Sequence, residues 1–558
     1  MTTRILTSLF LLLLTTGLHA QTLLKDIETF VPGASSSPSN WAVITEDLFI
    51  FEALNSPQSQ YLFASDGTES GTIGLGTYQV DTDIITFGEK AFFGGCNLLL
   101  GADSCTSLYV SDGTVAGTGF FFDLDPNGLS LGIEDIVAGD SLFFFSGHTN
   151  AAGYELFVSD GTKAGTRMVM DIAPGLTSGY VGELAVIDNI AYFAGYTDAH
   201  GEEAWRSDGT AEGTYMIADL NDGTADGNPY DFVQSGGYVY FSALGTNTGV
   251  ELRRTNGSEG NVELIGELGT TDSSWPREKV DSDGILYYAA EGNDAAGYEL
   301  VVYDHVGEPL HIDFNGVDIF PRALMAFGDG EVIFNAETEN GRELWRSDGT
   351  LAGTYMIIDL YPGEMDGVHG IGAPGESFYV WNDSLVYFAG ADSVNAKGEF
   401  VYELFVTDGT AAGTSLVSDQ IPGTEGSNPG NFFEFGDRLY FAATDANIGR
   451  EPFYLDFGTT TSINEPYSDL SISLSAYPNP LPKGAPLNVA FELPTATEVH
   501  AQLYDLQGNS VEGILSLGHL PAGQHDLQLQ LEDHPSGLYY LVLNAGTGSQ
   551  VNMPILME

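Results

Sequence analysis

Short runs of alternating apolar and polar residues, separated by glycine-rich turns, follow one another along most of the chain. One group consists of residues 215–220, 230–235, 238–244 and 249–255, and each run is rich in aromatic or β-branched residues. A period of two with this composition predicts β-strands, and no long window has the period of a helix. We therefore expect units of four strands, with 215–220 as the first strand of its unit.

An Asp-Gly turn separates each unit from the next. In the copy at Ser159–Thr166, the turn SDGTKAGT stands between the runs YELFV and RMVMDI. Asp-Gly between apolar segments is a strong hairpin signal, because glycine adopts positive φ without steric cost and the Asp side chain accepts hydrogen bonds from its own turn. We therefore expect the repeated aspartate to have a structural role in the turn. The alternative is that these aspartates bind ions. The residues concerned are Asp66, Asp112, Asp160, Asp208, Asp348 and Asp408.

The turn recurs at a nearly constant spacing. Asp160, Asp208, Asn256 and Asp304 follow one another at intervals of 48 residues, and further copies extend the series from Asp66 to residue 456. A fixed period of this size indicates a repeat array. One four-stranded sheet cannot bury both of its faces, whereas sheets stacked radially can. We therefore expect an all-β protein with a β-propeller of about eight or nine four-stranded blades, closed by packing of the first unit on the last.

Composition divides the chain into four parts. Residues 1–20 read as a signal peptide, with Arg4 before a short apolar core and small residues at the end. Residues 21–458 hold the repeats, and 459–469 form a polar linker. Residues 470–558 contain several short alternating runs that predict a small C-terminal β-sandwich. No later apolar run is long enough to cross a bilayer, so we expect no transmembrane segment in the mature protein.

The chain is strongly acidic, with 78 Asp and Glu against 17 Lys and Arg and a net charge of −61. Such a charge repels phosphate backbones and anionic membranes, which excludes nucleic acid as a partner. One explanation is solubility in a salty medium, where counter-ions screen the repulsion. The other is that some of the carboxylates bind Ca²⁺, which prefers oxygen ligands.

One loop fits the calcium pattern D-x-D-x-N-G-x5-E, although no helix is expected beside it and a proline interrupts it. Side-chain oxygens would come from the acidic and amide residues and a carbonyl from the leucine. The predicted ligands, and the only cofactor considered, are Asp123, Asp125, Asn127, Leu129 and Glu134 for Ca²⁺.

The chain has two cysteines, Cys96 and Cys105. In an exported protein a local disulfide between them is the expected state. A metal site or a catalytic thiol is the less favoured alternative, because no histidine lies nearby in the sequence and CxxC spacing is absent.

The segment GRELWRSDGTLAGT, Gly341–Thr354, resembles the ELWxxDGT repeat of secreted bacterial proteins. The resemblance extends over most of residues 23–457 and implies a propeller-like unit without a fixed activity. The copies at Glu251 and Glu299 have lost part of the turn.

The C-terminal segment resembles the type A sorting domain of the type IX secretion system of Bacteroidetes. The resemblance rests on the segments YPNP, LYDLQGN, LPAGQHDLQL and PSGLYYLVL, which occur in that order. It implies the type IX secretion machinery as a partner, export across the outer membrane, and release or attachment at the cell surface. The motif residues are Tyr477, Pro478, Asn479, Pro480, Gly537 and Tyr539.

These features favour an exported binding or adhesion scaffold for a glycan or a protein, with the contacts made by loops on one face of the propeller. A hydrolase or lyase acting on polysaccharides is the second interpretation, and a structural surface-layer component is the third. An enzyme requires one place where the repeat fails. The longest deviation, Gly363–Tyr402, contains Asp366, His369, Trp381 and Asp392.

Overall fold

The structure is a computed structural model with two compact units, Met1–Gly458 and Thr459–Glu558. The described residues are 21–29, 33–56, 59–97, 107–125, 132–175, 178–266, 273–292, 297–313, 319–363, 365–369, 378–395, 400–418, 426–457, 473–477, 481, 483, 486–493, 497–504, 515–529, 537–545 and 549–557. The predicted signal peptide and linker lie outside these ranges. None of the described segments is a helix that could span a bilayer.

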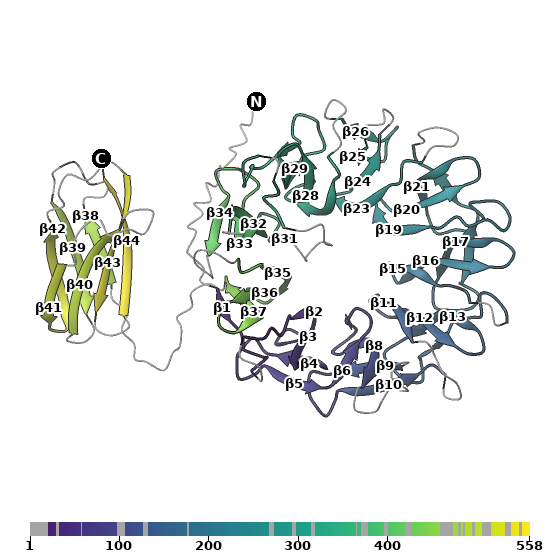
Figure 1. Cartoon of the computed structure of the whole chain (residues 1–558), viewed down its shortest axis with the longest axis horizontal. Coiled ribbons are helices and arrows are strands. Elements are labelled where there is room, and N and C mark those ends of the chain that lie inside the picture. Colours follow the sequence, from purple (N-terminus) through teal and green to yellow (C-terminus); the bar gives the residue numbers. More distant parts are fainter. Residues whose placement is uncertain are drawn as a thin grey trace, which may run out of the picture. The chain divides into compact units, whose positions relative to one another are not determined.

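The first unit is a ring of nine antiparallel sheets, counted over the described residues (Figure 1). The innermost strand of each sheet contacts the innermost strands of the neighbouring sheets, and in blade 2 this strand is β7. This arrangement is a nine-bladed β-propeller, so the all-β prediction is confirmed with the larger of the two expected blade numbers. Each blade runs outward in chain order, except that the second contains an extra short strand and the ninth takes its outermost strand from the N-terminus.

Blades 1 to 5 are built from the following strands: blade 1 from β2 (Ser39–Thr45), β3 (Leu48–Ser56), β4 (Ser59–Ser65) and β5 (Ile73–Gly76); blade 2 from β6 (Tyr78–Val80), β7 (Ile85–Thr86), β8 (Ala91–Asn97), β9 (Ser107–Ser111) and β10 (Gly119–Asp123); blade 3 from β11 (Ile133–Ala138), β12 (Phe143–Thr149), β13 (Gly153–Ser159) and β14 (Arg167–Met168); blade 4 from β15 (Gly182–Ile187), β16 (Ile190–Thr197), β17 (Gly201–Ser207) and β18 (Tyr215–Ala218); blade 5 from β19 (Tyr230–Ser235), β20 (Tyr238–Gly245), β21 (Gly249–Thr255) and β22 (Val262–Leu264).

Blades 6 to 9 follow the same plan: blade 6 is built from β23 (Arg277–Ser282), β24 (Ile285–Glu291), β25 (Tyr298–Tyr303) and β26 (Leu310–Ile312); blade 7 from β27 (Arg322–Phe327), β28 (Glu331–Thr338), β29 (Gly341–Ser347) and β30 (Tyr355–Met356); blade 8 from β31 (Phe378–Trp381), β32 (Leu385–Val394), β33 (Phe400–Thr407) and β34 (Ser415–Ser418); blade 9 from β35 (Gly430–Phe435), β36 (Arg438–Asp445), β37 (Gly449–Asp456) and the N-terminal β1 (Thr22–Leu23).

The blade boundaries differ by one strand from the expected units. Residues 215–220 were expected to begin a unit, but β18 pairs with β17 across the turn at Asp208 and is the outermost strand of blade 4. A tight turn joins strands that pair directly, so both belong to one sheet. The turn therefore lies inside a blade, and the longer connector after the fourth strand leads to the next blade.

The two ends of the repeat array meet in blade 9. Strand β1 pairs with β37, and Leu23 lies opposite Phe453. The next residue, Leu24, is almost completely buried in a cluster with Phe49 of blade 1 and Tyr440 of blade 9. The N-terminal strand thus supplies the fourth strand of the last blade and closes the ring.

The core is divided into layers, each between two neighbouring blades. One layer contains Leu156 and Val158 of blade 3 with Phe193 and Trp205 of blade 4. Comparable clusters lie at the other blade boundaries. Because every blade contributes to two layers, the apolar surface of a single blade is buried only when both neighbours are in place.

Polar contacts between first strands support the ring near its centre. The side chains of Asp135, Glu183, Asp231 and Glu278 each accept a hydrogen bond from a backbone N–H of the next blade, at 2.9 to 3.4 Å. The last three of these residues have positive φ and lie at bulges in their strands. The bulge turns the acidic side chain toward the next blade, so the irregularity serves blade-to-blade bonding.

The second unit contains a three-stranded and a four-stranded sheet. Leu487, Val489 and Phe491 of one sheet pack with Val499 and Leu541 of the other in a single buried cluster. This is the small β-sandwich that the alternating runs predict. Its sheets are β38 (Ser473–Tyr477), β39 (Leu487–Leu493) and β42 (Gly523–Leu529), and β41 (Leu515–Leu520), β40 (Thr497–Tyr504), β43 (Gly537–Ala545) and β44 (Ser549–Met557).

We expect Leu24→Ala to destabilise the propeller by about 2–5 kcal/mol, because it removes buried apolar atoms at the point of ring closure. Thermal unfolding of the whole protein measures the effect. Leu23→Ala is the matched control, because Leu23 is 37% exposed and its replacement should change stability by less than about 0.5 kcal/mol. Equal effects of the two substitutions would contradict a closing role for Leu24.

Candidate functional site

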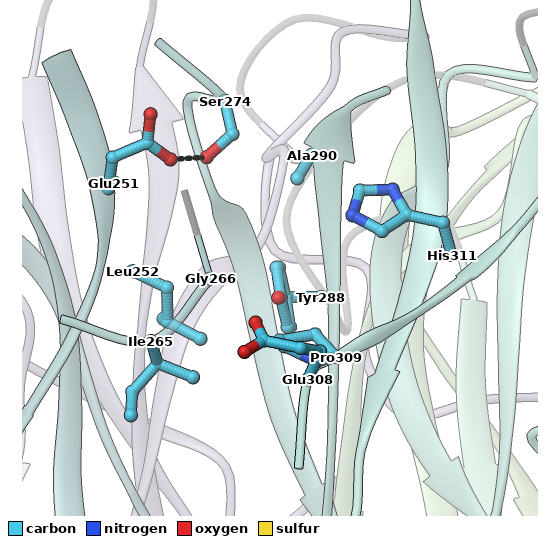
Figure 2. A pocket seen from close by; sticks show the side chains of 10 residues that line it. All are labelled: Glu251, Leu252, Ile265, Gly266, Ser274, Tyr288, Ala290, Glu308, Pro309 and His311. Atoms are coloured by element: carbon cyan, nitrogen blue, oxygen red, sulfur yellow. Dashed lines mark hydrogen bonds between the residues drawn. The ribbon is translucent and has the colours of Figure 1, made fainter. Parts of the chain in front are cut away.

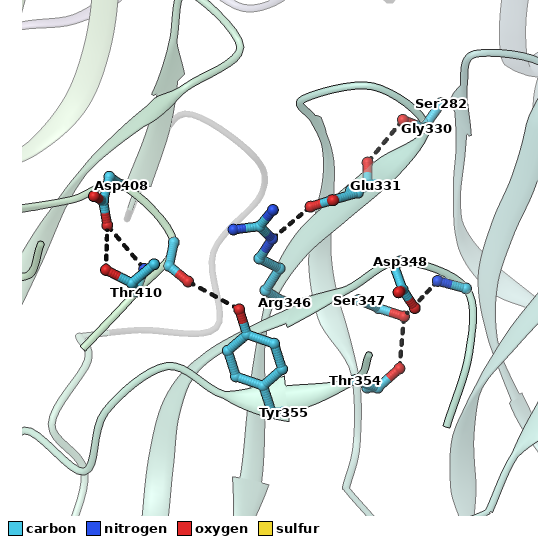
Figure 3. A network of polar contacts seen from close by, with 12 residues as sticks. Ser282, Gly330, Glu331, Arg346, Ser347, Asp348, Thr354, Tyr355, Asp408 and Thr410 are labelled. Carbon is cyan, nitrogen blue, oxygen red and sulfur yellow. Dashed lines mark hydrogen bonds and ion pairs between the residues drawn. The ribbon is translucent and has the colours of Figure 1, made fainter. Parts of the chain in front are cut away.

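The repeated Asp-Gly turn is a closed hydrogen-bond network (Figure 3). In blade 7 the backbone N–H and the hydroxyl of Thr350 both donate to Asp348 Oδ1, at 2.9 and 2.7 Å, and Ser347 Oγ lies 2.7 Å from Thr354 Oγ1. A Cβ atom on Gly353 would lie 2.0 Å from Asp348 Oδ1, which explains the second glycine of the motif. Asp66, Asp112, Asp160, Asp208 and Asp408 accept the same pair of bonds.

The recurrent glutamate of the third strand is buried and holds the connector to the next blade. Glu155 accepts hydrogen bonds from the backbone N–H groups of Ile172 and Gly179, at 2.8 and 3.0 Å. Burial raises the pKa of this carboxyl to about 7, although the two N–H groups act in the opposite direction. Burial likewise raises the pKa of Glu203 and Glu451 to about 7 and that of Glu343 to about 8.

Among the described residues, a serine of the connector donates to this glutamate in three places. The pairs are Ser36 with Glu451, Ser427 with Glu403, and Ser274 with Glu251. A contact that recurs around the ring serves the geometry of the connector. The Ser–Glu pairs are therefore structural and are not activated nucleophiles.

The predicted calcium ligands are only partly described. Asn127 and Leu129 lie outside the described residues. Asp125 Oδ2 accepts a hydrogen bond from the backbone N–H of Asn150 at 2.8 Å, and Asp123 Oδ1 accepts one from Asp125 at 3.1 Å. No group of three or more potential metal ligands occurs among the residues that the structure describes, and calcium binding by this loop, including Glu134, stays a prediction.

Cys96 is buried at the end of β8 and is disulfide-bonded. Its predicted partner, Cys105, lies outside the described residues, so the identity of the pair stays a prediction.

In the longest deviation from the repeat, the polar residues Asp366 and His369 both lie near Arg342. Asp366 binds Arg342, with 3.1 Å between Oδ2 and the guanidinium. His369 packs against Tyr402 with 4.6 Å between ring centroids. Trp381 instead belongs to the buried layer between blades 8 and 9. Nothing is described of the Asp392 side chain.

Another place is a row of three cross-strand neighbours on the second, third and fourth strands of each blade. In blade 4 the row is Phe193, Trp205 and Met216, on the second, third and fourth strands. In blade 6 it is Tyr288, Val301 and His311. The second-strand residue is phenylalanine in the other blades: Phe51, Phe93, Phe145, Phe193, Phe241, Phe334, Phe388 and Phe441.

At the third-strand position the residue type changes in blades 5 and 6, and at the fourth-strand position it changes in blade 6. The third-strand residue is aromatic everywhere except at Arg253 and Val301, and His311 takes the place of residues without a polar side chain. The aromatic third-strand residues are Phe63, Tyr109, Phe157, Trp205, Trp345, Phe405 and Phe453; the fourth-strand residues are Gly74, Phe120, Met168, Met216, Leu264, Met356, Leu416 and Leu23.

A pocket of about 220 Å³ lies where these changes occur, between blades 5 and 6 (Figure 2). In blades 4 and 7 the tryptophan of the row packs against the preceding blade. The corresponding Val301 is smaller and is buried in the layer between blades 5 and 6, and its two cross-strand neighbours, Tyr288 and His311, line the pocket. The full lining is Glu251, Leu252, Ile265, Gly266, Ser274, Tyr288, Ala290, Glu308, Pro309 and His311.

The pocket has an apolar wall and several polar groups. Leu252, Ile265 and Ala290 supply apolar surface, and Glu308 adds a carboxylate (Figure 2). His311 Nδ1 lies 2.9 Å from Glu299 Oε2, a buried carboxylate that fixes the imidazole. Glu299 is the recurrent third-strand glutamate of blade 6, and in this blade it binds the side chain of His311.

Burial also raises the pKa of Tyr288, so its hydroxyl stays protonated and can donate a hydrogen bond. The pocket therefore offers a donor, carboxylate acceptors and apolar surface within a space suited to one small group.

None of the pocket residues was singled out as a functional residue from the sequence. A signal existed, because the copies at Glu251 and Glu299 were recognised as degenerate. Aligning all nine units would have shown Tyr288, Val301 and His311 as departures, but only the strand register makes them neighbours.

In the second unit, Tyr539 of β43 is buried in the sandwich core, and Gly537 begins the same strand. Tyr477 ends β38, whereas Pro478, Asn479 and Pro480 lie outside the described residues. Residues 475–556 match a family model. They form a secretion system C-terminal sorting domain. The sorting domain implies the type IX secretion machinery as a partner and shows that the protein is exported to the cell surface or the medium.

The comparison with curated proteins found no match. Among solved structures, the chain is similar to prolyl oligopeptidase B from Galerina marginata, with 12% identity, a TM-score of 0.38, and 83% of this chain and 57% of that chain covered. It is also similar to a puromycin-hydrolyzing peptidase of Mycobacterium tuberculosis, with 10% identity, a TM-score of 0.36, and 74% and 57% covered. The chain thus spans little more than half of those proteins. Likeness at this level carries no argument about activity.

The raised pKa of the buried glutamates predicts how stability depends on pH. A folded-state pKa of about 7 for Glu155, above the usual 4.5, means that the folded protein binds the proton more tightly than the unfolded chain. Stability should therefore fall as pH rises from about 4.5 to about 7. Melting temperatures across this range, compared between the wild type and Glu155→Gln, measure the effect. The advantage of the wild type over the variant should shrink as pH rises, and a constant difference would contradict the prediction.

If the loop from Asp123 to Glu134 binds Ca²⁺, millimolar CaCl₂ should raise the melting temperature of the wild type, and EDTA should reverse the rise. Glu134→Gln should abolish the shift, because it removes the predicted bidentate ligand. Asp171→Asn, in the corresponding loop of the next unit, is the control and should leave the shift intact. The absence of any shift in the wild type would exclude the site.

Proposed function

We propose that this exported propeller is a binding protein that captures one small group of a glycan or protein ligand in the pocket between blades 5 and 6. The observation that carries the proposal is that two departures from the repeat, Tyr288 and His311, line the same pocket, and that the third, Val301, lies between them in the row. In the other blades the second-strand residue is a phenylalanine, and the third-strand residue is aromatic in all of them but blade 5. In blade 6 the valine has less apolar volume than the aromatic residue of other blades, and the tyrosine and histidine add polar groups. A ligand site needs both changes, whereas a scaffold needs neither.

Binding is favoured over catalysis by the contacts inside the pocket. His311 is bonded to Glu299, and the Ser274–Glu251 pair belongs to a set that recurs in two other blades. The recurrence makes the Ser274–Glu251 contact structural, and among the described residues His311 is not hydrogen-bonded to the nucleophile that acyl transfer requires. The polysaccharide hydrolase or lyase remains the alternative function, and a structural surface-layer component is the third.

We also assign the propeller to the ELWxxDGT-repeat proteins of Bacteroidetes. This assignment is supported by the turn motif and by the buried glutamate, aromatic residue and turn that follow one another in Gly341–Thr354. The family model that matches this chain covers the sorting domain alone.

The proposal is tested by thermal shift of the whole protein with neutral monosaccharides, amino sugars and free amino acids as probes. We expect at least one probe to raise the melting temperature, by an amount that grows with its concentration. Val301→Trp should abolish the shift, because tryptophan occupies this position in blades 4 and 7 and would fill the pocket. Tyr288→Phe and His311→Met should weaken it, because each restores the residue found in other blades.

Met216→Leu, at the His311 position of blade 4, is the matched control and should leave the shift unchanged. If no probe shifts the wild type, or if Val301→Trp keeps the shift, the pocket is not the ligand site. Cleavage of a bound oligosaccharide or peptide, followed by chromatography, would favour the enzyme instead.

A further inference from the structure

A second feature recurs in the connectors that lead into the first strands. In six blades, counted over the described residues, the residue two positions before the first paired residue of that strand has a left-handed backbone, with φ between 41° and 48°. These residues are Ser37, Tyr180, Asn228, Trp275, Phe320 and Asn428. The backbone N–H of four of these residues donates to a carbonyl at the start of a third strand; the four are Ser37, Asn228, Trp275 and Asn428. The backbone N–H of Tyr180 donates to Ser178 Oγ.

Three of these residues are aromatic and exposed. Tyr180 is 58% exposed, Trp275 45% and Phe320 38%. Asparagine adopts a left-handed backbone at little cost, whereas a bulky side chain in this region is a true outlier. Each ring thus combines an unfavourable backbone with an unfavourable exposure, and burial in the core does not compensate for either. Strain of this kind, held in place by surrounding bonds, indicates a functional position.

The three rings lie on one face of the propeller. All blades have the same strand order, so the same repeat position in each blade lies at the same end of its sheet. Strands β15, β19, β23 and β27, which follow Tyr180, Asn228, Trp275 and Phe320, contact one another in that order. The aromatic rings therefore follow an arc over blades 4 to 7, with the exposed amide of Asn228 between the first two.

Neighbouring rings hold two of these side chains in position. The ring of Tyr180 meets Tyr196 edge-on, with 5.8 Å between centroids. Phe320 lies 5.9 Å from Tyr298, on whose face the guanidinium of Arg277 stacks at 3.6 Å. Rigid, preorganised aromatic surface lowers the entropy cost of binding a ligand.

We propose that Tyr180, Trp275 and Phe320 form a platform on which a neutral polysaccharide chain stacks its sugar rings. Aromatic faces match the C–H faces of sugars, and exposed amide and hydroxyl groups at Asn228, Asn428 and Ser37 match their hydroxyls. A ligand made of repeated units suits contacts that repeat from blade to blade. The net charge of −61 excludes polyanionic chains, and the export shown by the sorting domain brings the protein to where extracellular polysaccharides occur.

The platform goes beyond the proposed pocket function, because none of the three rings lines the pocket. The two sites are also separable by experiment. Val301→Trp fills the pocket and leaves the platform, whereas substitutions of the three rings leave the pocket.

The test is affinity electrophoresis of the whole protein in gels that contain laminarin, xyloglucan or mannan, with alginate as the polyanionic comparison. Tyr180→Asn, Trp275→Asn and Phe320→Asn place the residue of blades 5 and 9 at the same position, so each variant should fold with an unchanged or higher melting temperature. We expect the wild type to be retarded by at least one neutral polysaccharide and not by alginate. Each substitution should weaken binding about tenfold, as expected for the loss of one aromatic contact.

Leu351→Ala is the control, because Leu351 is an exposed apolar residue outside the platform and alanine stands at that place in the turns of blades 4 and 8. It should bind as the wild type does. The inference is overturned if none of the three neutral polysaccharides retards the wild type. It is also overturned if the asparagine variants bind these polysaccharides as well as the wild type does. Retained polysaccharide binding in Val301→Trp supports the platform as a site of its own.

Discussion

The buried glutamate of the third strand is the contact on which the rest of the propeller depends. A carboxyl group without access to water is costly unless its oxygens are bonded, and here backbone N–H groups of the connector supply the bonds. The same bonds fix the path of the chain from one blade to the next. They also place the left-handed residue that follows, and through it the start of the next first strand. In blades 3 to 9, which have this glutamate, one side chain thus links the interior of a sheet to the position of its neighbour.

Repetition makes departures from the repeat informative. A residue that recurs around the ring, such as the aspartate of the turn, has a geometric explanation that needs no ligand. The row of Tyr288, Val301 and His311 has no such explanation, because the second-strand residue is a phenylalanine in every other blade and no other fourth-strand residue has a polar side chain. The exposed rings of Tyr180, Trp275 and Phe320 are a different kind of departure. Their left-handed backbone is shared with the same position in other blades, and only their side chains differ from the repeat. The first departure opens a space inside the wall of the ring, and the second changes the surface of one face.

Much of the fold follows from local chemistry. The Asp-Gly turns and the two-residue alternation predict strands, period and ring, since each signal lies within a few residues. The assignment of strands to blades was wrong by one, because a repeating pattern has no marked beginning and only pairing across the turn shows which strands share a sheet. The pocket was missed for a related reason. Tyr288, Val301 and His311 are separated in the sequence and meet only through antiparallel register, and left-handed backbone at an aromatic residue has no sequence signature.

Closure by the N-terminal strand has a consequence for the order of folding. Ile27 bonds to Glu451, a partner 424 residues away along the chain, so the last layer cannot form until nearly all of the propeller has been synthesised. Contacts between such distant residues form slowly, because the entropy of closing so large a loop must be lost first. Until then the first and last blades each present an uncovered apolar face. An incomplete chain therefore stays recognisable to proteases and chaperones, and only the full-length ring hides the surface that they bind.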